Sequence, residues 1–216
     1  MEEDGFTLVT NKKRKLKKAK FIPHKGYSPH DLAAGFSKEE LKASVEKCYQ
    51  ELMNSPFIQE IDLIVDKLKE LNPKSIVCYA LGKIDNLYCQ APKYQLAMLL
   101  HIKYRLKIEK ALVFDPVLTE VELNAIQGFK IERILVNEEG RRLVEERTLF
   151  IIFHGEKFLF ENLINTNRFC KQNIIILGND LKHVLENQLS AGINSVQILN
   201  SFYRETIFDS CVLQWF

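Results

Sequence analysis

Residues that could hold a small molecule stand at the ends of the short apolar runs of this sequence. They are Gly82, Asp115, His154 and the pair Gly178 and Asn179. A carboxylate, an imidazole and an amide beside a glycine are groups that converge in small-molecule pockets. Glycine, Asp-Pro and Asn-Asp are also the residues that turns and helix caps require. A ligand pocket and a purely structural role therefore both stay open for them.

Complete catalytic motifs are missing from the sequence. The turn after the first apolar run contains a single glycine, Gly82, in place of the G-x-G-x-x-G that lets a pyrophosphate approach the backbone. Neither a phosphate-binding G-x-x-x-x-G-K-[ST] loop nor a G-x-S-x-G nucleophile elbow occurs. His154 and Cys170 lie sixteen residues apart, and nothing in the pattern orients them as base and nucleophile. The sequence favours binding over catalysis and assigns no catalytic residue.

The cysteines give no sign of a metal site. All five are scattered, without a Cys-x-x-Cys pair or a nearby histidine cluster: Cys48, Cys78, Cys89, Cys170 and Cys211. We expect them to be reduced thiols packed as small hydrophobic side chains, in a reducing compartment.

Short apolar runs alternate with helical patterns from residue 75 onward. The expected strands cover 75–81, 111–114, 131–136, 149–153 and 174–177, with a sixth candidate at 196–199. Helical spacing fills 91–107, 119–128, 158–169 and about 181–189. Continuous apolar runs are typical of strands that are buried on both faces of a parallel sheet. The pattern predicts an α/β fold with a Rossmann-like, open, mainly parallel sheet of five or six strands, whose carboxyl ends would bring the candidate pocket residues to one crevice.

Two further helices are expected before the sheet, within residues 37–71. Ser37 and Glu40 have the spacing of a capping box, Ser55-Pro56 begins a second helix, and Asn72-Pro73 ends it. Residues 1–35 have no regular apolar spacing and several Pro and Gly breakers. We therefore expect a flexible basic arm over 1–35 and a single domain over 36–216, with its core sheet between 75 and 200.

Charge is concentrated in the first twenty residues. They hold seven basic side chains against three acidic ones, whereas the remaining 196 residues sum to −2. The arm contains a cluster that resembles a nuclear-import signal: Lys12, Lys13, Arg14, Lys15, Lys17 and Lys18. A solubilising arm is the open alternative. We expect a cytoplasmic protein, with a nuclear location also open.

Two classes of partner are disfavoured by composition. The nearly neutral body offers no broad basic face for nucleic acid as the main partner. With 46% hydrophobic and 27% charged residues, and no apolar run of membrane-spanning length, the sequence is typical of a soluble globular protein and disfavours a membrane partner.

Several blocks of the sequence resemble the sensitivity-to-red-light-reduced domain family of plant, fungal and animal proteins. The blocks are CYALGKI (78–84), APKYQLAMLL (91–100), FDPVLTEVE (114–122), VNEEGRR (136–142), TLFIIFHG (148–155), ENLINTN (161–167) and IIILGND (174–180). The beginning, DGFTLVTNKKRK (4–15), is also similar to that of family members. The residues that carry the family motifs are Asp115, Pro116, Glu120, Glu139, Gly140, His154, Asn162 and Asn167.

The resemblance implies a Rossmann-like regulatory protein without established catalysis. Family members are described as components of a circadian-clock input pathway, and animal members are linked to regulation of haem biosynthesis and of clock-gene expression. The resemblance implies protein partners, not yet identified, and no established cofactor. The sequence departs from the family pattern at Gly155, where cysteine is frequent, at Arg168, where tryptophan is frequent, and at Asp180, where serine is frequent.

An enzyme of a different class stays open beside the regulatory interpretation. In a degenerate Rossmann-like S-adenosylmethionine-dependent methyltransferase, Gly82 would lie beneath the cofactor and Asp115 would bind its ribose. Another unknown small ligand would suit the same residues. A link to haem does not require haem binding, because the lone His154 has no paired axial ligand in the pattern.

Overall fold

The computed structural model describes residues 35–87, 89–181, 197–199 and 211–216. The chain divides into two units, Met1–Ala34 and Gly35–Phe216, and the fold described here is that of the second unit. The expected basic arm with its import-like cluster, and nearly all of the helix expected at about 181–189, lie outside the described residues.

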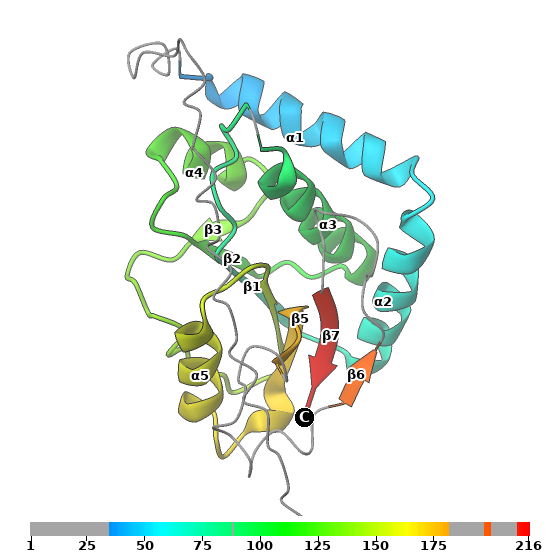
Figure 1. Ribbon diagram of the computed structural model, residues 1–216, viewed down its shortest axis with the longest axis vertical. Coiled ribbons are helices and arrows are strands. Elements are labelled where there is room, and N and C mark those ends of the chain that lie inside the picture. Colours follow the sequence, from blue (N-terminus) through cyan, green and yellow to red (C-terminus); the bar gives the residue numbers. More distant parts are fainter. Residues whose placement is uncertain (1–34, 88, 182–196, 200–210) are drawn as a thin grey trace, which may run out of the picture. The chain divides into compact units, whose positions relative to one another are not determined.

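A seven-stranded sheet, counted over the described residues, forms the centre of this unit (Figure 1). Its strands are β1 (Ser75–Tyr79), β2 (Ala111–Phe114), β3 (Glu132–Arg133), β4 (Thr148–Ile152), β5 (Ile174–Asn179), β6 (Gln197–Leu199) and β7 (Cys211–Trp215). Their order is β3-β2-β1-β4-β5-β7-β6. Strands β1 to β5 pair in parallel, and β7 lies antiparallel between β5 and β6. The predicted Rossmann-like, mainly parallel sheet is confirmed, and the antiparallel β7 was not predicted.

The continuous apolar runs are needed because both faces of the sheet are covered. Every residue of β1 and β4 is buried. Alternate residues contribute to two separate cores: Cys78 and Ile151 belong to one, and Val77 and Phe150 belong to the other. Because successive side chains of a strand point to opposite faces, the apolar residues that follow Ser75 in β1 and Thr148 in β4 fill both cores.

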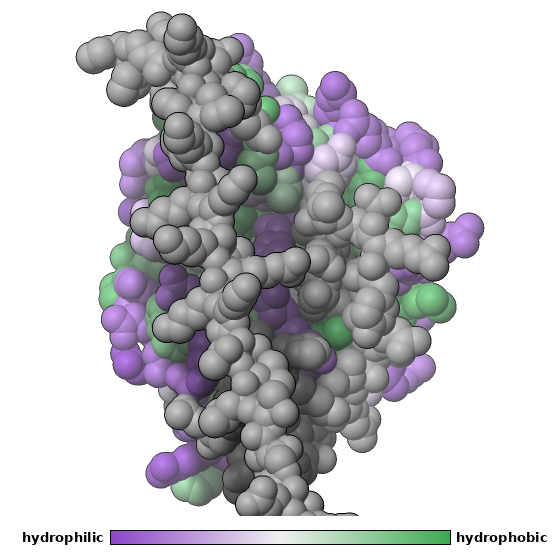
Figure 2. Space-filling view, in the orientation of Figure 1, coloured by the Kyte–Doolittle hydropathy of each residue, from purple (hydrophilic) through white to green (hydrophobic). Residues whose placement is uncertain are grey.

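The helices are divided between the two faces (Figure 1). The larger core contains residues of α1 (Lys38–Met53), α2 (Ile58–Leu71), α3 (Ala91–Leu106) and α4 (Glu120–Gln127). The smaller core contains residues of α5 (Lys157–Thr166). On the face seen in Figure 2, mostly hydrophilic side chains lie along α1, as expected for the outer surface of an amphipathic helix. Within the described residues, no helix is long and apolar enough to cross a membrane.

The helix boundaries follow the capping signals closely. Ser37 accepts a hydrogen bond from the Glu40 N–H, and the Ser37 N–H donates to the Glu40 carboxylate at 2.8 Å, so the predicted capping box is confirmed. Asn72 ends α2 in the left-handed conformation, with φ of 51°. The beginning of α2 differs from the prediction, because Pro56 lies in a turn and the helix begins at Ile58.

Several predicted elements are shorter than their apolar patterns, among them β1, which ends at Tyr79 and not at Leu81. Only Glu132–Arg133 forms β3, since these two residues alone pair with β2. Leu135 and Val136, included in the prediction, are 78% and 70% exposed. Helix α5 ends at Thr166 and not at 169, and the Asn167 side chain donates to the Leu163 carbonyl at that end.

One buried carboxylate joins α4 to the segment that follows β1. Glu122 is fully buried, and its Oε1 accepts from the backbone N–H groups of Ile84 at 2.7 Å and Asp85 at 3.1 Å. Its Oε2 accepts from the backbone N–H and the hydroxyl of Thr119, at 2.8 and 2.9 Å, in the capping box of α4. Four donors thus satisfy a carboxylate that would otherwise be costly to bury.

We expect Glu122→Gln to lower the free energy of unfolding by about 2–3 kcal/mol, because an amide offers one acceptor oxygen to two pairs of donors. Glu120→Gln is the matched control on the same helix, since Glu120 is exposed and pairs only with Arg133 among the described residues. That exposed pair is worth less than about 1 kcal/mol. Chemical denaturation measures both changes, and equal losses in the two variants would contradict the role given to Glu122.

Candidate ligand-binding site

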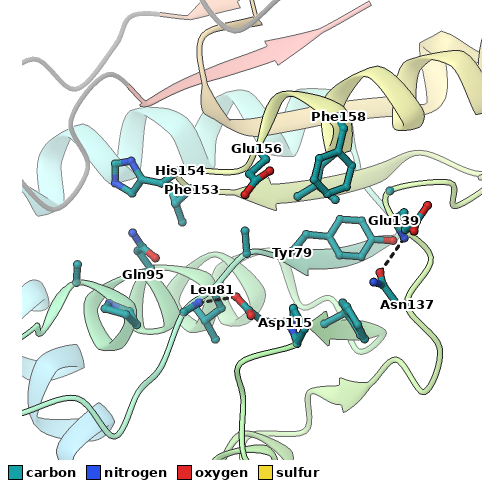
Figure 3. A pocket seen from close by; sticks show the side chains of 18 of the residues that line it. Tyr79, Leu81, Gln95, Asp115, Asn137, Glu139, Phe153, His154, Glu156 and Phe158 are labelled. Carbon is teal, nitrogen blue, oxygen red and sulfur yellow. Dashed lines mark hydrogen bonds between the residues drawn. The ribbon is translucent and has the colours of Figure 1, made fainter.

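A cavity of about 450 Å³ opens at the carboxyl ends of β1, β2 and β4 (Figure 3). The chain runs outward from β1 through β2 to β3, and then crosses to β4 on the other side of β1. The cavity therefore lies at the point where the strand order reverses, which is where open α/β sheets bind ligands. Gly82, Asp115 and His154, expected together from the sequence, all line it.

The first wall is the backbone that leaves β1. Gly82 has φ of +81°, a conformation that favours glycine, and a Cβ atom there would lie 3.1 Å from Cγ of Pro92. The Gly82 N–H donates to Oδ2 of Asp115 at 2.8 Å. Gly82 thus turns the chain at the cavity and ties the loop after β1 to the end of β2.

Asp115 forms the second wall at the end of β2. Its Oδ1 accepts from the Val117 N–H at 3.0 Å, while Oδ2 holds Gly82. Two oxygens of a carboxylate can accept about four hydrogen bonds, and Asp115 is only half-buried. It therefore keeps capacity to accept donors from a ligand.

The NEEG segment after β3 forms the third wall. Oδ1 of Asn137 accepts from the Glu139 N–H at 3.0 Å, and Glu139 and Gly140 both have positive φ, at 49° and 79°. A Cβ atom at Gly140 would lie 2.5 Å from the carbonyl oxygen of Leu159. This position requires glycine, because the loop is pressed against α5 at its backbone.

Asn162 of α5 and Asn167, the residue that caps the end of α5, hold this loop and the chain that follows it. Asn162 donates to the Glu139 carbonyl at 2.8 Å. Asn167 is fully buried, donates to the Arg142 carbonyl at 2.8 Å and accepts from the Val144 N–H at 2.9 Å. These two family-motif residues bind backbone and do not line the cavity.

The remaining motif residues divide between cavity and surface. Pro116, Glu139, Gly140, Asp115 and His154 line the cavity. Glu120 lies on the exposed side of α4 and pairs with Arg133 at 2.8 Å. The family pattern therefore marks the loops around the cavity more than any group of reactive side chains.

The fourth wall is the turn after β4. His154 is exposed and has φ of 52°. At Gly155, a Cβ atom would lie 2.3 Å from Cγ2 of Ile152. Any larger residue at this position, cysteine included, would require the turn to shift.

Gln95 on α3 lines the cavity and was missed by the sequence analysis. It is 3% exposed, and its side-chain amide has no hydrogen-bond partner among the described residues. In Figure 3 the amide points toward the space between Leu81 and His154. The available signal was a polar residue in a helix that is buried from Pro92 to Lys103 almost without interruption.

Gly178 and Asn179, also expected in the pocket, do not line the cavity. A Cβ atom at Gly178 would lie 2.0 Å from the Ile152 carbonyl oxygen, so this glycine lets β4 and β5 approach. Asn179 pairs with Cys211 of β7, and its carbonyl accepts from Nε2 of Gln214 at 2.8 Å. The unpredicted β7 thus occupies the end of β5.

Tyr79 and His154 both line the cavity. The Tyr79 hydroxyl donates to Glu138 at 2.6 Å; burial, and secondly this bond, raises the pKa of Tyr79, so it stays a protonated donor. Within the described residues, His154 makes no hydrogen bond to a hydroxyl or thiol that it could activate. No group of three or more His, Cys, Asp or Glu side chains in the described part of the chain could hold a metal ion.

The thiols agree only in part with the packing expected of them. Cys48 and Cys78 are buried and Cys170 is partly buried, whereas Cys89 is exposed and lines the cavity. The prediction of a buried thiol is wrong for Cys89. The side chain of Cys211 lies outside the described residues.

The sequence profile of the SRR1 domain matches residues 39–214. The chain belongs to the SRR1 domain family. Protein SENSITIVITY TO RED LIGHT REDUCED 1 of Arabidopsis thaliana is 27% identical over 165 residues, which are 71% of this chain and 58% of that protein. SRR1-like protein of Mus musculus is 27% identical over 119 residues, 53% of this chain and 47% of that protein. The chain thus spans about half the length of these curated relatives.

Among solved structures, the SAH-bound methyltransferase PaMTH1 of Podospora anserina has a TM-score of 0.44 and 13% identity, covering 80% of this chain and 88% of that one. Similarity at this level is not evidence of a shared ligand or reaction. The family resemblance in the sequence blocks is confirmed by the profile and by both curated relatives.

We expect Asn167→Ala to lower the free energy of unfolding by about 2–3 kcal/mol, since it leaves the buried Val144 N–H and Arg142 carbonyl without partners. Asn162→Ala is the control, because it removes an exposed bond to the same loop and should cost about 1 kcal/mol or less. Urea denaturation compares them. A loss at Asn162 as large as that at Asn167 would contradict the distinction between the two residues.

Proposed function

We propose that this SRR1-domain chain is a regulatory protein that binds a small organic molecule in the cavity at the strand-order reversal. The observation that carries the proposal is the side-chain amide of Gln95, a residue that is 3% exposed, whose amide faces the cavity and has no hydrogen-bond partner among the described residues. The amide atoms are open to the cavity, so a ligand that enters it can hydrogen-bond to Gln95, a bond worth about 0.5–1.5 kcal/mol.

The cavity has the size and composition of a ligand site. Small-molecule pockets commonly range from about 300 to 1,000 Å³ and combine apolar walls with a few polar groups. Here Leu81, Pro92, Phe114 and Phe153 supply apolar wall, beside the polar group of Gln95. The Gly82–Asp115 hydrogen bond fixes two loops of the wall before any ligand arrives.

The regulatory part of the proposal is supported by the family. The printed name of the Arabidopsis relative refers to reduced sensitivity to red light. Within that role we include input to the circadian clock and control of haem biosynthesis and clock-gene expression, as the sequence resemblance implies. Protein partners would respond to the ligand-bound state of the chain. Their location would determine whether it acts in the cytoplasm or in the nucleus.

A second candidate is a methyltransferase that uses S-adenosylmethionine. The observation in its favour is the position of Asp115, which ends β2 beside Gly82 and keeps unused acceptor capacity at the cavity. That carboxylate could accept hydrogen bonds from the hydroxyls of a ribose. The loop Leu81-Gly82-Lys83 contains only one glycine, which leaves the first candidate ahead.

We expect Gln95→Leu to keep the free energy of unfolding within about 1 kcal/mol of the wild-type value, since no hydrogen bond among the described residues is lost. The same change should abolish binding of any metabolite that stabilises the wild type in a thermal-shift screen. In cells whose own copy is replaced by this variant, clock-gene and haem-biosynthetic transcripts should lose their dependence on the protein.

Gln214→Leu is the matched control for this variant. Gln214 is 1% exposed, but its amide is satisfied by the Leu181 N–H at 2.9 Å and the Asn179 carbonyl at 2.8 Å. We expect this change to cost about 2 kcal/mol or more. If Gln95→Leu were as destabilising, Gln95 would be a structural residue and the proposal would lose its main support.

The methyltransferase candidate predicts a thermal shift with S-adenosylmethionine or with its demethylated product. At a ligand concentration of one hundred times Kd, binding adds about 2.7 kcal/mol to the free energy of unfolding. Asp115→Asn should weaken that shift. The absence of any shift with either compound would remove this candidate and leave the regulatory one.

A further inference from the structure

We infer that the cavity selects a positively charged organic molecule without phosphate groups. This inference rests on the proposed function, because it names the chemical class of the ligand for the same cavity. The charges, the aromatic side chains and the unpartnered Gln95 amide each contribute to it.

The charged side chains that line the cavity are all acidic within the described residues. They are Asp115, Glu139 and Glu156, and neither lysine nor arginine is among the described lining residues. Glu139 is paired with Arg141 and is thereby neutralised in part. Asp115 and Glu156 remain without a basic partner among the described residues, so a phosphate in the cavity would meet two carboxylates, the imidazole of His154 and no lysine or arginine.

Glu156 is free to face a ligand. It is the residue before α5, yet its carboxylate makes no capping hydrogen bond to that helix. In Figure 3 Glu156 and Asp115 lie on opposite walls of the cavity, one from the turn after β4 and the other from the end of β2. The N-terminus of α5 carries a partial positive charge of about half an elementary charge, which offsets part of the charge of one carboxylate. The net charge of the groups lining the cavity therefore stays negative.

Aromatic side chains complete the environment that organic cations prefer. Tyr79, Phe114, Phe153 and Phe158 all line the cavity. The face of an aromatic ring attracts a cation through its quadrupole, and rings combined with carboxylates are the usual surroundings of ammonium-type ligands. Aromatic walls with acids at the rim therefore favour an ammonium or sulfonium compound over a nucleotide.

Gln95 is an observation independent of the charges. Acidic residues around a depression are common on protein surfaces, whereas Gln95 is a residue 3% exposed whose side-chain amide faces the cavity and has no hydrogen-bond partner among the described residues. Its carbonyl oxygen can accept a hydrogen bond from an amino or hydroxyl group of the ligand. The ligand would supply the hydrogen-bond donors, both to Gln95 and to the carboxylates that line the cavity.

Cys89 provides a direct measure of the charge selectivity. Its thiol is exposed and lines the cavity, so it can be modified in the whole folded protein. The test uses two methanethiosulfonate reagents, one carrying a trimethylammonium group and one a sulfonate. The rate at which each modifies Cys89 is divided by its rate with a free thiol in solution. At low ionic strength the cationic reagent should be favoured about tenfold, and the ratio should fall with added salt. Mass spectrometry of the Cys89 peptide separates this thiol from the others.

Glu156→Gln should reduce the ratio about threefold. Glu145→Gln is the matched control, because Glu145 is exposed and does not line this cavity. It removes the same charge and should leave the ratio unchanged. An equal or faster reaction of the sulfonate reagent in the wild type would overturn the inference, as would a loss of selectivity in the control as large as that in Glu156→Gln.

Protection of Cys89 tests the ligand class itself. Phenyltrimethylammonium should slow modification by a neutral reagent, and phenyl phosphate at the same concentration should not. Protection by the phosphate, or by neither compound, would overturn the inference. Neither of these outcomes changes the result expected for Gln95→Leu. A wrong ligand class can therefore be distinguished from a wrong proposed function.

Discussion

The arrangement of the cavity depends on two carboxylates that accept backbone hydrogen bonds from the chain after β1. Asp115 holds the Gly82 N–H, and Glu122 holds those of Ile84 and Asp85. Once a strand ends, its N–H groups have no neighbouring strand to bind, and a buried donor without an acceptor is costly. The next structural unit, the β2 end with α4, supplies the acceptors. The loop is thereby fixed relative to β2 at the edge where a ligand would bind.

The opposite side of the cavity uses amides for the same purpose. Asn162 and Asn167 hold the segment from Glu139 to Val144 against α5. This explains why the sequence blocks that carry the family resemblance contain Gly140 and two asparagines without forming a catalytic set. Their side chains determine where the NEEG loop lies, and a loop of defined shape is what a selective binding site requires. The family motifs thus include residues that fix the position of the NEEG loop, one wall of the cavity.

The sheet could be predicted because its parallel strands are apolar on both faces. The runs at β1, β4 and β5 have no polar alternation, which leaves a parallel core as the natural interpretation. Strand β7 could not be predicted in this way, because it contains Gln214, a polar residue type usual at surfaces that is buried here. The prediction failed in the other direction at β3, where Leu135 and Val136 are apolar yet exposed. In both places the pairing partner, which sequence does not display, decides the outcome.

The residues of the candidate site could also be predicted only in part. The rule that ligands bind beyond the carboxyl ends of strands selects Gly82, Asp115 and His154. It does not select side chains that reach the cavity from a helix packed on the sheet, such as Gln95 of α3. Gln95 and Gln214 are two glutamines of nearly equal burial, at 3% and 1% exposure. One amide is satisfied by β5 and its following turn, and the other faces an open cavity. Nothing in residue type or local pattern separates them. The difference arises only in the fold, which places a donor and an acceptor beside the amide of Gln214 and leaves the amide of Gln95 facing the cavity.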